Sequence, residues 1–502
     1  MEPGEGARAM ARRVLIAARG EVAIRVARAT RELGWEPVTI YEDADRASPH
    51  VRAGIVSAPV RSYTDMDSII DAAVKTGADV VHPGYGFLSE SPEFAEKVLD
   101  AGLSWAGPHP KAMRMLGDKA SAKALAEKLG VPTLPWCRAT SAEEAEACAE
   151  KIGYPVVLKA SRAGGGRGMR VARRPGEAAS LYRLVAVEAR LGFGDGGEVY
   201  VERYIEAPRH IEVQVLGDED GRVLHLYERE CSLQRRRQKV VEEAPSPLAE
   251  RIPGLRERLL GYALRLAEHV GYTSAGTVEF IVDRRGNAYF IEANTRLQVE
   301  HGVTEEVTGV DIVKMQLLVA AGDRLPLRQS DVRLHGWAIE ARIYAEDPWA
   351  GFQASEGVVT RYREPRGPGI RVDSGIEEGQ RVSSRYDTLL AKVIARGMDR
   401  GEAVARLRAA LREMVVAGVE TNLDLLRVVA ESPWFADGEY STTLLEEQLP
   451  ELLGAAEERR ALAAAIASQL HAHGNGARSI AAAPRLTVVS HSYGWPWPPW
   501  RG

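Results

Sequence analysis

The 502-residue sequence predicts a soluble protein of roughly three domains with α/β and α+β architecture. The chain is too long for one hydrophobic core, and its 45% hydrophobic and 27% charged residues are typical of globular proteins. Residues 12–112 alternate short apolar runs with helical patterns, whereas residues 154–301 contain several consecutive strand patterns.

The N-terminal region predicts an open parallel sheet with helices on both faces. Strands are expected at residues 14–17, 38–41, 79–81 and 104–106, and helices at 21–33, 68–75 and 92–99. The loop 84–87 follows the third strand, where open α/β sheets bind ligands, although its glycines equally suit a tight turn. Residues 12–112 contain no G-x-G-x-x-G pattern, so dinucleotide binding by this region is not supported.

A helical connector at 113–131 precedes a Gly-rich loop at 163–168, which lies between strands predicted at 154–161 and 169–171. Glycine lets backbone N–H groups approach phosphate oxygens closely, and Lys159 on the adjacent strand would add a positive charge. This arrangement favours a flap over ATP phosphates, as in kinases. An ordinary hairpin with a flexible tip is the alternative.

Further strands are expected at 199–205, 211–216 and 224–228, the last two as an antiparallel pair. The basic run at 234–239 suits either a nuclear-localisation or nucleic-acid patch or a loop for an anionic small molecule. The net charge of −5 favours the second interpretation.

Residues 290–301 predict a metal-binding and anion-binding strand. In extended backbone, alternate side chains share one face. That face would carry Glu292, Asn294, Arg296, Gln298 and Glu300. A turn at 283–287 would place Glu279 opposite Glu292, and two facing carboxylates require a partner such as Mg²⁺. A solvated polar face is the alternative.

The remaining chain predicts a helix over 303–319 with Asp311 near its start, and an α+β segment at 331–446 with a helix at 402–414. Arg342 lies in a strand predicted at 336–343, and Glu340 on its own face is the expected partner. Residues 451–472 are Ala-rich and helix-prone. The Trp/Pro-rich end at 493–500 either docks on another surface or is disordered.

The sequence contains few features that indicate the cellular compartment of the protein. Cys137, Cys148 and Cys231 have no metal-ligand spacing, so free thiols in a reducing cytoplasm are expected. No apolar run reaches the length of a membrane span, and the polar N-terminal residues do not form a secretory signal.

Seven motifs together resemble the biotin carboxylase component of biotin-dependent carboxylases, a branch of the ATP-grasp superfamily. The resemblance runs from about residue 12 to 449. It rests on RGE at 19–21, HPGYGFLSE at 82–90, GDK at 117–119, GGGRGM at 164–169, QKVVEEAP at 238–245, NTRLQVEH at 294–301 and AEDP at 345–348.

The resemblance implies a flexible arm at 1–11, an N-terminal α/β domain at 12–116, and an ATP-grasp domain at 117–330 with a flap subdomain at about 133–205. A C-terminal α+β domain at 331–450 and an Ala-rich helix with a Trp/Pro tail at 451–502 would follow. The implied reaction is ATP-dependent carboxylation of biotin on a carrier protein, using bicarbonate through carboxyphosphate, with Mg²⁺ or Mn²⁺.

The resemblance also implies roles for individual residues. ATP phosphates would contact Lys119, Lys159, Gly165, Gly166 and His210, the adenine edge would contact Glu202, Arg203, Tyr204 and Ile205, and Gln234 and Arg237 would complete the nucleotide site. The metal would be bound by Glu279, Glu292 and Asn294. Bicarbonate would be positioned by Lys239, Arg296, Gln298 and the backbone of Val299, deprotonated by Glu300, and Arg342 would stabilise the biotin enolate.

Five positions depart from the family pattern: Ala18, Ala163, Arg237, Gly302 and Trp337. A biotinylation sequence and a carboxyltransferase segment are not found, so both are expected on separate partner chains, with this chain as a cytoplasmic homodimer that binds neither nucleic acid nor membrane. An acyl-CoA carboxylase, such as acetyl-CoA carboxylase, is the expected complex. The alternatives are a two-subunit pyruvate carboxylase, a different ATP-grasp ligase that joins a carboxylate to an amine, and a catalytically impaired ATP-grasp scaffold.

Overall fold

The computed structural model describes residues 12–160, 169–193 and 199–474. The predictions for the N-terminal arm, for Ala163, Gly165 and Gly166 in the Gly-rich loop, and for the Trp/Pro tail lie outside these residues. Compact packing groups the chain up to Ala456 into one unit, and the remainder forms a second.

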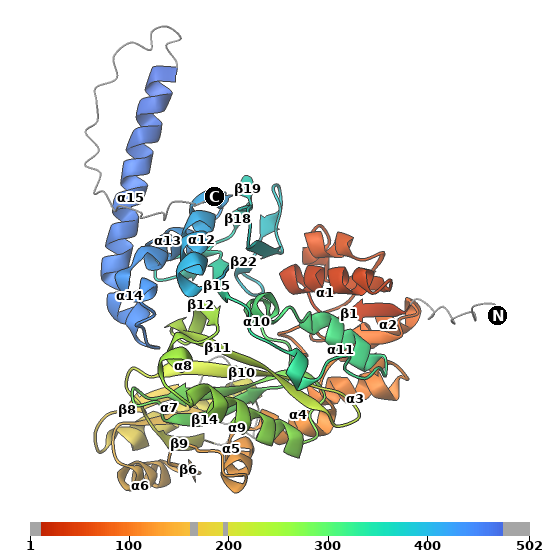
Figure 1. Cartoon of the computed structure of the whole chain (residues 1–502), viewed down its shortest axis with the longest axis vertical. Coiled ribbons are helices and arrows are strands. Elements are labelled where there is room, and N and C mark those ends of the chain that lie inside the picture. The colour runs from red at the N-terminus through yellow and green to blue at the C-terminus, as the bar shows by residue number, and fades with distance from the viewer. Residues whose placement is uncertain (1–11, 161–168, 194–198, 475–502) are drawn as a thin grey trace, which may run out of the picture. The chain divides into compact units, whose positions relative to one another are not determined.

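The N-terminal sheet is parallel, as the alternating pattern predicts, but a strand at residues 56–59 joins the four expected strands and brings the number to five (Figure 1). Their spatial order is β3 (Val56–Pro59), β2 (Glu36–Tyr41), β1 (Arg13–Ile16), β4 (Val80–His82) and β5 (Ser104–Trp105). Val14 and Ile16 pack in one hydrophobic cluster and Leu15 in another, so the two sheet faces are both buried. The covering helices are α1 (Gly20–Glu32), α2 (Met66–Lys75) and α3 (Pro92–Asp100).

Two helices replace the single connector expected at 113–131. They are α4 (Pro110–Gly117) and α5 (Lys119–Lys128). Asp118 lies between them in extended conformation, and its side chain accepts a hydrogen bond from the backbone N–H of Ser121. Because an aspartate in this position caps a new helix, the chain turns here instead of continuing one long helix.

A small antiparallel sheet carries the strands that flank the Gly-rich loop. Its order is β6 (Trp136–Ala139), β9 (Val199–Arg203), β7 (Val156–Ala160) and β8 (Met169–Ala172), and α6 (Ala142–Ile152) and α7 (Glu177–Phe193) pack against it. The expectation of three free thiols is wrong, because Cys137 and Cys148 form a disulfide between β6 and α6. Packing of α6 on β6 brings their Cα atoms to 6.2 Å, within reach of a bridge.

An eight-stranded sheet forms the centre of the first unit (Figure 1). Its order is β14 (Ala288–Asn294), β13 (Ser274–Val282), β10 (Arg209–Gly217), β11 (Val223–Arg235), β12 (Gln238–Ala244), β15 (Trp337–Tyr344), β22 (Leu389–Gly397) and β20 (Ile370–Ser374). The predicted antiparallel pair corresponds to β10 and β11. The pairing of β12 with β15 continues the sheet across residue 331, where the sequence predicts a domain limit.

Alternation along the central strands gives this sheet one apolar and one charged face. Ile211, Val213 and Phe280 point to the apolar side and share a hydrophobic cluster with residues of α9 (Leu255–His269). His210 precedes Ile211, and Glu279 precedes Phe280, so both point to the opposite side, where they are almost fully buried. A buried ionic surface therefore faces away from α9.

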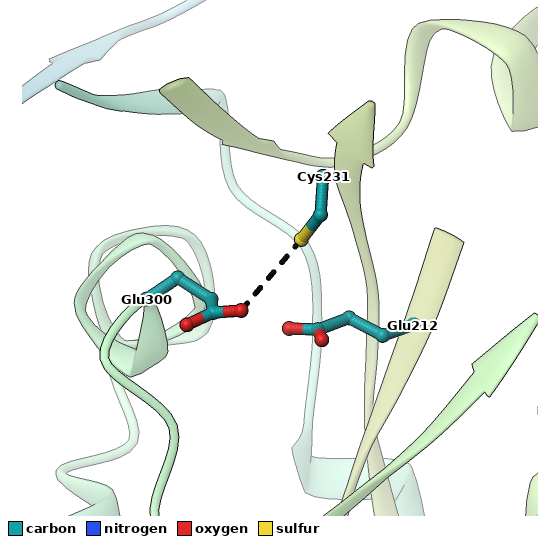
Figure 2. Close-up of side chains that lie close together, drawn as sticks. All are labelled: Glu212, Cys231 and Glu300. Atoms are coloured by element: carbon teal, nitrogen blue, oxygen red, sulfur yellow. Dashed lines mark hydrogen bonds between the residues drawn. The ribbon is translucent and has the colours of Figure 1, made fainter. Parts of the chain in front are cut away.

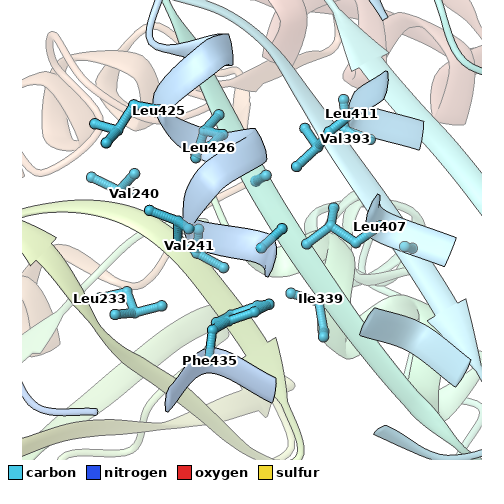
Figure 3. Packing of buried hydrophobic residues seen from close by; sticks show 14 of the residues in the cluster. Leu233, Val240, Val241, Ile339, Val393, Leu407, Leu411, Leu425, Leu426 and Phe435 are labelled. Carbon is cyan, nitrogen blue, oxygen red and sulfur yellow. The ribbon is translucent and has the colours of Figure 1, made fainter. Parts of the chain in front are cut away.

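The same division continues where the later strands join. Leu233, Val241 and Ile339 pack with Phe435 and with side chains of α12 (Arg400–Glu413) and α13 (Leu423–Glu431), as Figure 3 shows. The opposite face is covered by α10 (His301–Thr308). The helix expected over 303–319 is interrupted, and Asp311 caps a second helix, α11 (Ile312–Ala320).

The remaining α-helices and strands are short, apart from the last helix. They are α8 (Pro247–Arg251), α14 (Pro433–Ala436), α15 (Leu444–Gly474) and the strand pairs β16 (Glu346–Asp347) with β17 (Gln353–Ala354), β18 (Gly357–Val358) with β21 (Arg381–Val382), and β19 (Arg361–Arg363) with β23 (Val415–Ala417). Among the helices described, none combines the length and the apolar character needed to cross a bilayer.

Candidate active site

The hairpin of β13 and β14 places Glu279 directly opposite Glu292, as the sequence predicts. The turn closes through a hydrogen bond from the backbone N–H of Asp283 to the carbonyl of Asn287. The Asn294 amide donates to Glu279 Oε1 at 2.6 Å. Two carboxylates and an amide oxygen are the hard donors that Mg²⁺ and Mn²⁺ prefer, so this group fits the expected cation.

The prediction that residues 290–301 form one strand face is wrong beyond Asn294. β14 ends there, and Glu300 immediately precedes α10. Arg296 contacts Glu90 at 3.2 Å and donates to Gln298 Oε1 at 2.9 Å. Gln298 in turn donates to Thr277 Oγ1 at 2.9 Å, so side-chain contacts shape this segment instead of a strand ladder.

Lys239 joins three carboxylates on the charged face of the sheet. Its Nζ lies 2.6 Å from Glu300, 2.8 Å from Glu212 and 3.2 Å from Glu279. These acids come from β10, β13 and the start of α10. The lysine therefore links the predicted base to the predicted metal ligands, although their sequence positions are far apart.

Glu300 is held as a carboxylate. Burial alone would raise its pKa, but Lys239 and Arg342 outweigh that effect and hold the pKa well below its usual range. Arg342 donates to Glu300 Oε2 at 2.9 Å. The group thus has the protonation state that a base requires at neutral pH.

Glu212, Cys231 and Glu300 also converge, as Figure 2 shows, and their spacing would allow a cation. The Cys231 thiol donates to Glu300 at 3.8 Å, and burial raises its pKa well above the usual value. Metal binding requires the thiolate, whereas Lys239 and Arg229 already neutralise both carboxylates. We interpret this trio as part of an ion-pair cluster.

Arg342 has two closer partners than the one expected. Glu340 on the same strand lies 4.0 Å away, whereas Glu242 on β12 forms a closer ion pair and Glu300 forms the second. β12 pairs with β15 so that Glu242 faces Glu340 directly. Cross-strand packing, which sequence spacing does not reveal, therefore decides the partner of Arg342.

The predicted nucleotide residues divide between the two antiparallel sheets. On the large sheet, His210 contacts Glu279 at 2.8 Å and Gln234 at 2.6 Å, while Lys119 forms an ion pair with Glu292. On the small sheet, Lys159 contacts Glu202 at 2.5 Å.

The other predicted site residues lie at the ends of strands or in turns. Arg203 donates to the carbonyl of Gly153 at 2.8 Å, and Tyr204 and Ile205 follow β9 directly. Arg237 lies in the turn between β11 and β12 with φ of 68°, a backbone region uncommon outside glycine, and burial lowers its pKa. The backbone carbonyl of Val299 accepts a hydrogen bond from Lys392 at 2.7 Å.

Sequence reasoning missed several charged residues that complete the site. Lys123, Arg229 and Lys392 are fully buried, and each pairs with a carboxylate. Glu212 and Glu242 are equally buried acids that contact Lys239 and Arg342. The helix predicted at 113–131 places Lys123 on the same face as Lys119, four residues earlier. This spacing was a sequence signal that could have identified Lys123 as a neighbour of the site.

Comparisons with known proteins agree with this geometry. Three family models match in order: the biotin carboxylase N-terminal domain over residues 10–113, the ATP-binding domain of the carbamoyl-phosphate synthase L chain over 118–328, and the biotin carboxylase C-terminal domain over 340–447. Together they span most of the described chain.

Individual relatives extend the match. Biotin carboxylase from Nostoc sp. is 44% identical over 443 residues, which cover 87% of this chain and 98% of the relative. A pyruvate carboxylase subunit from Methanothermobacter thermautotrophicus is 44% identical over 443 residues, or 87% of this chain and 89% of the relative.

One similar solved structure is the biotin carboxylase domain dimer of Hydrogenobacter thermophilus 2-oxoglutarate carboxylase, determined with magnesium ADP, ADP and bicarbonate. It has a TM-score of 0.85 and 45% identity, covering 88% of this chain and 98% of that one. The chain therefore belongs to the biotin carboxylase family, within the ATP-grasp fold, and is an ATP-dependent ligase that carboxylates biotin with bicarbonate.

Proposed function

We propose that this chain is the biotin carboxylase subunit of an acyl-CoA carboxylase, such as acetyl-CoA carboxylase, and acts on biotin carried by a separate protein. The observation that carries the carboxylation chemistry is Glu300, a buried carboxylate fixed between Lys239 and Arg342. The similarity to the Nostoc biotin carboxylase supports the carboxylation of biotin.

Bicarbonate would bind between Arg296, Gln298, Lys239 and the backbone of Val299. Glu300 would remove the bicarbonate proton, so that the resulting oxyanion attacks the terminal phosphorus of ATP and gives carboxyphosphate and ADP. Protonation of Glu300 removes its attraction for Arg342. Carboxyphosphate would break into CO₂ and phosphate, the phosphate would take the N1′ proton of biotin, and N1′ would attack CO₂. Arg342 would stabilise the negative charge that develops on the ureido ring, while Glu242 continues to hold the guanidinium.

ATP phosphates would contact Lys119, Lys159 and His210 together with Gly165 and Gly166. Residues 202–205 would hold the adenine edge, and Gln234 and Arg237 would complete the pocket. A divalent cation bound by Glu279, Glu292 and Asn294 would neutralise phosphate charge. Lys119 and Lys239 offset these carboxylates in the absence of the cation.

We also propose that the biotin carrier and the carboxyltransferase are separate chains, that two copies of this chain form a dimer, and that it functions in the cytoplasm. The domain limits at 116, 330 and 450 belong to the same proposal. The dimeric relative supports the dimer, and the positions of the three family matches support the domain limits.

A two-subunit pyruvate carboxylase is the second candidate, favoured by the similarity to the pyruvate carboxylase subunit from Methanothermobacter thermautotrophicus. The acyl acceptor never meets this chain, so co-purification distinguishes the two. A biotinylated partner accompanied by an acyl-CoA carboxyltransferase would support the first proposal, whereas one with a pyruvate-binding domain would support the second.

A catalytically impaired scaffold would conflict with the contacts retained around Glu300. Trp337, one of the departures from the family pattern, packs in the apolar cluster and donates to Glu243 at 2.5 Å. The decisive experiment measures bicarbonate-dependent ADP release with free biotin and Mg²⁺. Absence of biotin-stimulated turnover at every ATP concentration would refute the catalytic proposal.

Two substitutions test the roles in bicarbonate activation. Glu300→Gln removes the base, and we expect kcat to fall by about 10²–10⁴-fold. Arg296→Ala removes a cationic contact and should lower kcat by about 10²–10³-fold. ADP binding should survive in both, and Glu257→Gln on the exposed side of α9 serves as the matched control. Unchanged turnover in either active-site variant would contradict the assigned role.

A further inference from the structure

Helix α5 presents two lysines, one turn apart, to two different sheets. Lys119 forms an ion pair with Glu292 on β14 of the large sheet. Lys123 forms an ion pair with Glu202 on β9 of the small sheet, and its Nζ also donates to the carbonyl of Phe290 on β14 at 3.2 Å. The helix therefore connects both sheets that carry predicted nucleotide residues.

Glu202 divides its carboxylate between two lysines. One oxygen contacts Lys123, and the other accepts from Lys159 Nζ at 2.5 Å. Lys123 and Glu202 are fully buried, whereas Lys159 retains 12% exposure of its side chain. Burial opposes ionisation of Glu202, but the two lysines together lower its pKa. The carboxylate is consequently charged and depends on its neighbours.

This arrangement matters because Lys159 is also the lysine proposed to contact ATP phosphates. In the structure, Lys159 is bound to Glu202, so a phosphate must compete with that carboxylate. A buried carboxylate that lost its only cation would be strongly destabilised. Lys123 removes this obstacle, because it continues to neutralise Glu202 when Lys159 moves.

We propose that Lys123 is a positioning residue for the nucleotide site, a permanent counter-ion of Glu202 that allows Lys159 to leave for the phosphates. The inference rests on the proposed role of Lys159. Lys123 itself would touch neither ATP nor bicarbonate, since its ammonium group is occupied by Glu202 and Phe290. Its effect should therefore appear in nucleotide affinity and not in the chemical step.

The test compares Lys123→Met with the wild-type enzyme. Methionine keeps much of the side-chain length but removes the charge, so Lys159 becomes the sole cationic partner of Glu202 among the described residues. We expect the KM for ATP and the Kd for magnesium ADP, measured by calorimetry, to rise by about tenfold or more. The value of kcat at saturating ATP should remain within about threefold of wild type.

The double variant Lys123→Met with Glu202→Gln supplies the discriminating control. It replaces the buried ion pair by neutral groups of similar size, so Lys159 no longer has a carboxylate to leave. Because Glu202 is also proposed to contact adenine, the reference is Glu202→Gln alone, and the ADP affinity of the double variant should lie within about threefold of that single variant. A double variant that binds ADP about tenfold or more weakly than Glu202→Gln alone would overturn the proposal, because the effect of Lys123 would then not depend on Glu202.

Two further variants separate this inference from the proposed function. Lys128→Met on the exposed face of α5 should leave ADP affinity unchanged. Lys159→Met should weaken it. If Lys159→Met has no effect, the proposed phosphate contact and this inference both fail. If Lys159→Met weakens binding while Lys123→Met only lowers the melting temperature, Lys123 is merely structural and this inference alone fails.

Discussion

Glu242 and Glu340 are buried carboxyl groups that face each other across β12 and β15. Both oxygens of Glu340 lack a hydrogen-bond partner among the described residues, and Arg342 Nε lies 4.0 Å away. Burial raises the pKa of Glu340 well above its usual value and that of Glu242 to about 7, despite the opposing effect of Lys392 on Glu340 and of Arg342 on Glu242. Burial therefore favours the protonated form of Glu340, which limits the negative charge beside Glu300.

A pH-dependent stability follows from these raised pKa values. A carboxyl with a higher pKa in the folded state favours folding at low pH and loses that contribution as pH rises through the folded value. Glu340→Gln removes the titration. The melting temperature of the variant relative to wild type should therefore increase between pH 5.5 and pH 8, by about 2 °C or more. Scanning fluorimetry at both pH values measures the difference.

The exposed Glu257 provides the control for this prediction. Glu257→Gln should change the melting temperature equally at both pH values. A pH-independent effect of Glu340→Gln would show that the pair does not hold a proton in the folded state.

At the scale of elements, Gly302 controls how closely α10 approaches the sheet. A Cβ atom at this position would lie 2.4 Å from Ile394 Cδ1 on β22 and 3.4 Å from Glu340 Oε2. The first distance is far inside van der Waals contact. Gly302, one of the positions that depart from the family pattern, therefore lies in a closely packed contact near Glu300, the residue immediately before α10.

Gly302→Ala should destabilise the protein by about 1–3 kcal/mol, because the added methyl group overpacks the contact. Ile394→Val removes the methyl group that the new Cβ atom would contact, so it serves as the second substitution of a double-mutant cycle. Thermal or chemical unfolding is measured for wild type, both single variants and the double variant. The loss of unfolding free energy in the double variant should be smaller than the sum of the losses in the two single variants. Additive effects would indicate that Ile394 is not the obstructing group.

At the scale of the whole molecule, the proposed nucleotide site draws residues from both antiparallel sheets. Lys159 and Glu202 belong to the small sheet, and Glu279, Glu292 and His210 to the large one. Nucleotide bound between the two sheets should therefore stabilise the folded chain. The large sheet itself is continuous from β14 to β20, so residues after 331 extend the surface that carries the base.

Magnesium ATP should therefore raise the melting temperature in a concentration-dependent manner. A ligand at 100 times its Kd adds about 2.7 kcal/mol to the free energy of unfolding. Chelation of the metal should remove most of the shift, and Glu292→Gln should reduce the dependence on Mg²⁺. An identical shift with ATP and a chelator would contradict the proposed metal site.

Local patterns in the sequence were sufficient for several features. Alternating apolar runs and helices predicted the parallel N-terminal sheet, and the turn at 283–287 predicted that Glu279 faces Glu292. Both rest on periodicity and turn chemistry, which neighbouring residues encode. The motifs that carry the family resemblance are likewise short segments, so the sequence alone determined the family and its chemistry.

The tertiary structure decided which charges meet. Lys123 and Phe290 are separated by 167 positions, and Glu300 and Arg342 by 42, yet each pair is joined by a hydrogen bond. The end of β14 at Asn294 and the pairing of β12 with β15 were equally hidden in the sequence. Periodicity specifies which face of an element a side chain occupies, whereas the partner across that face depends on the packing of distant elements.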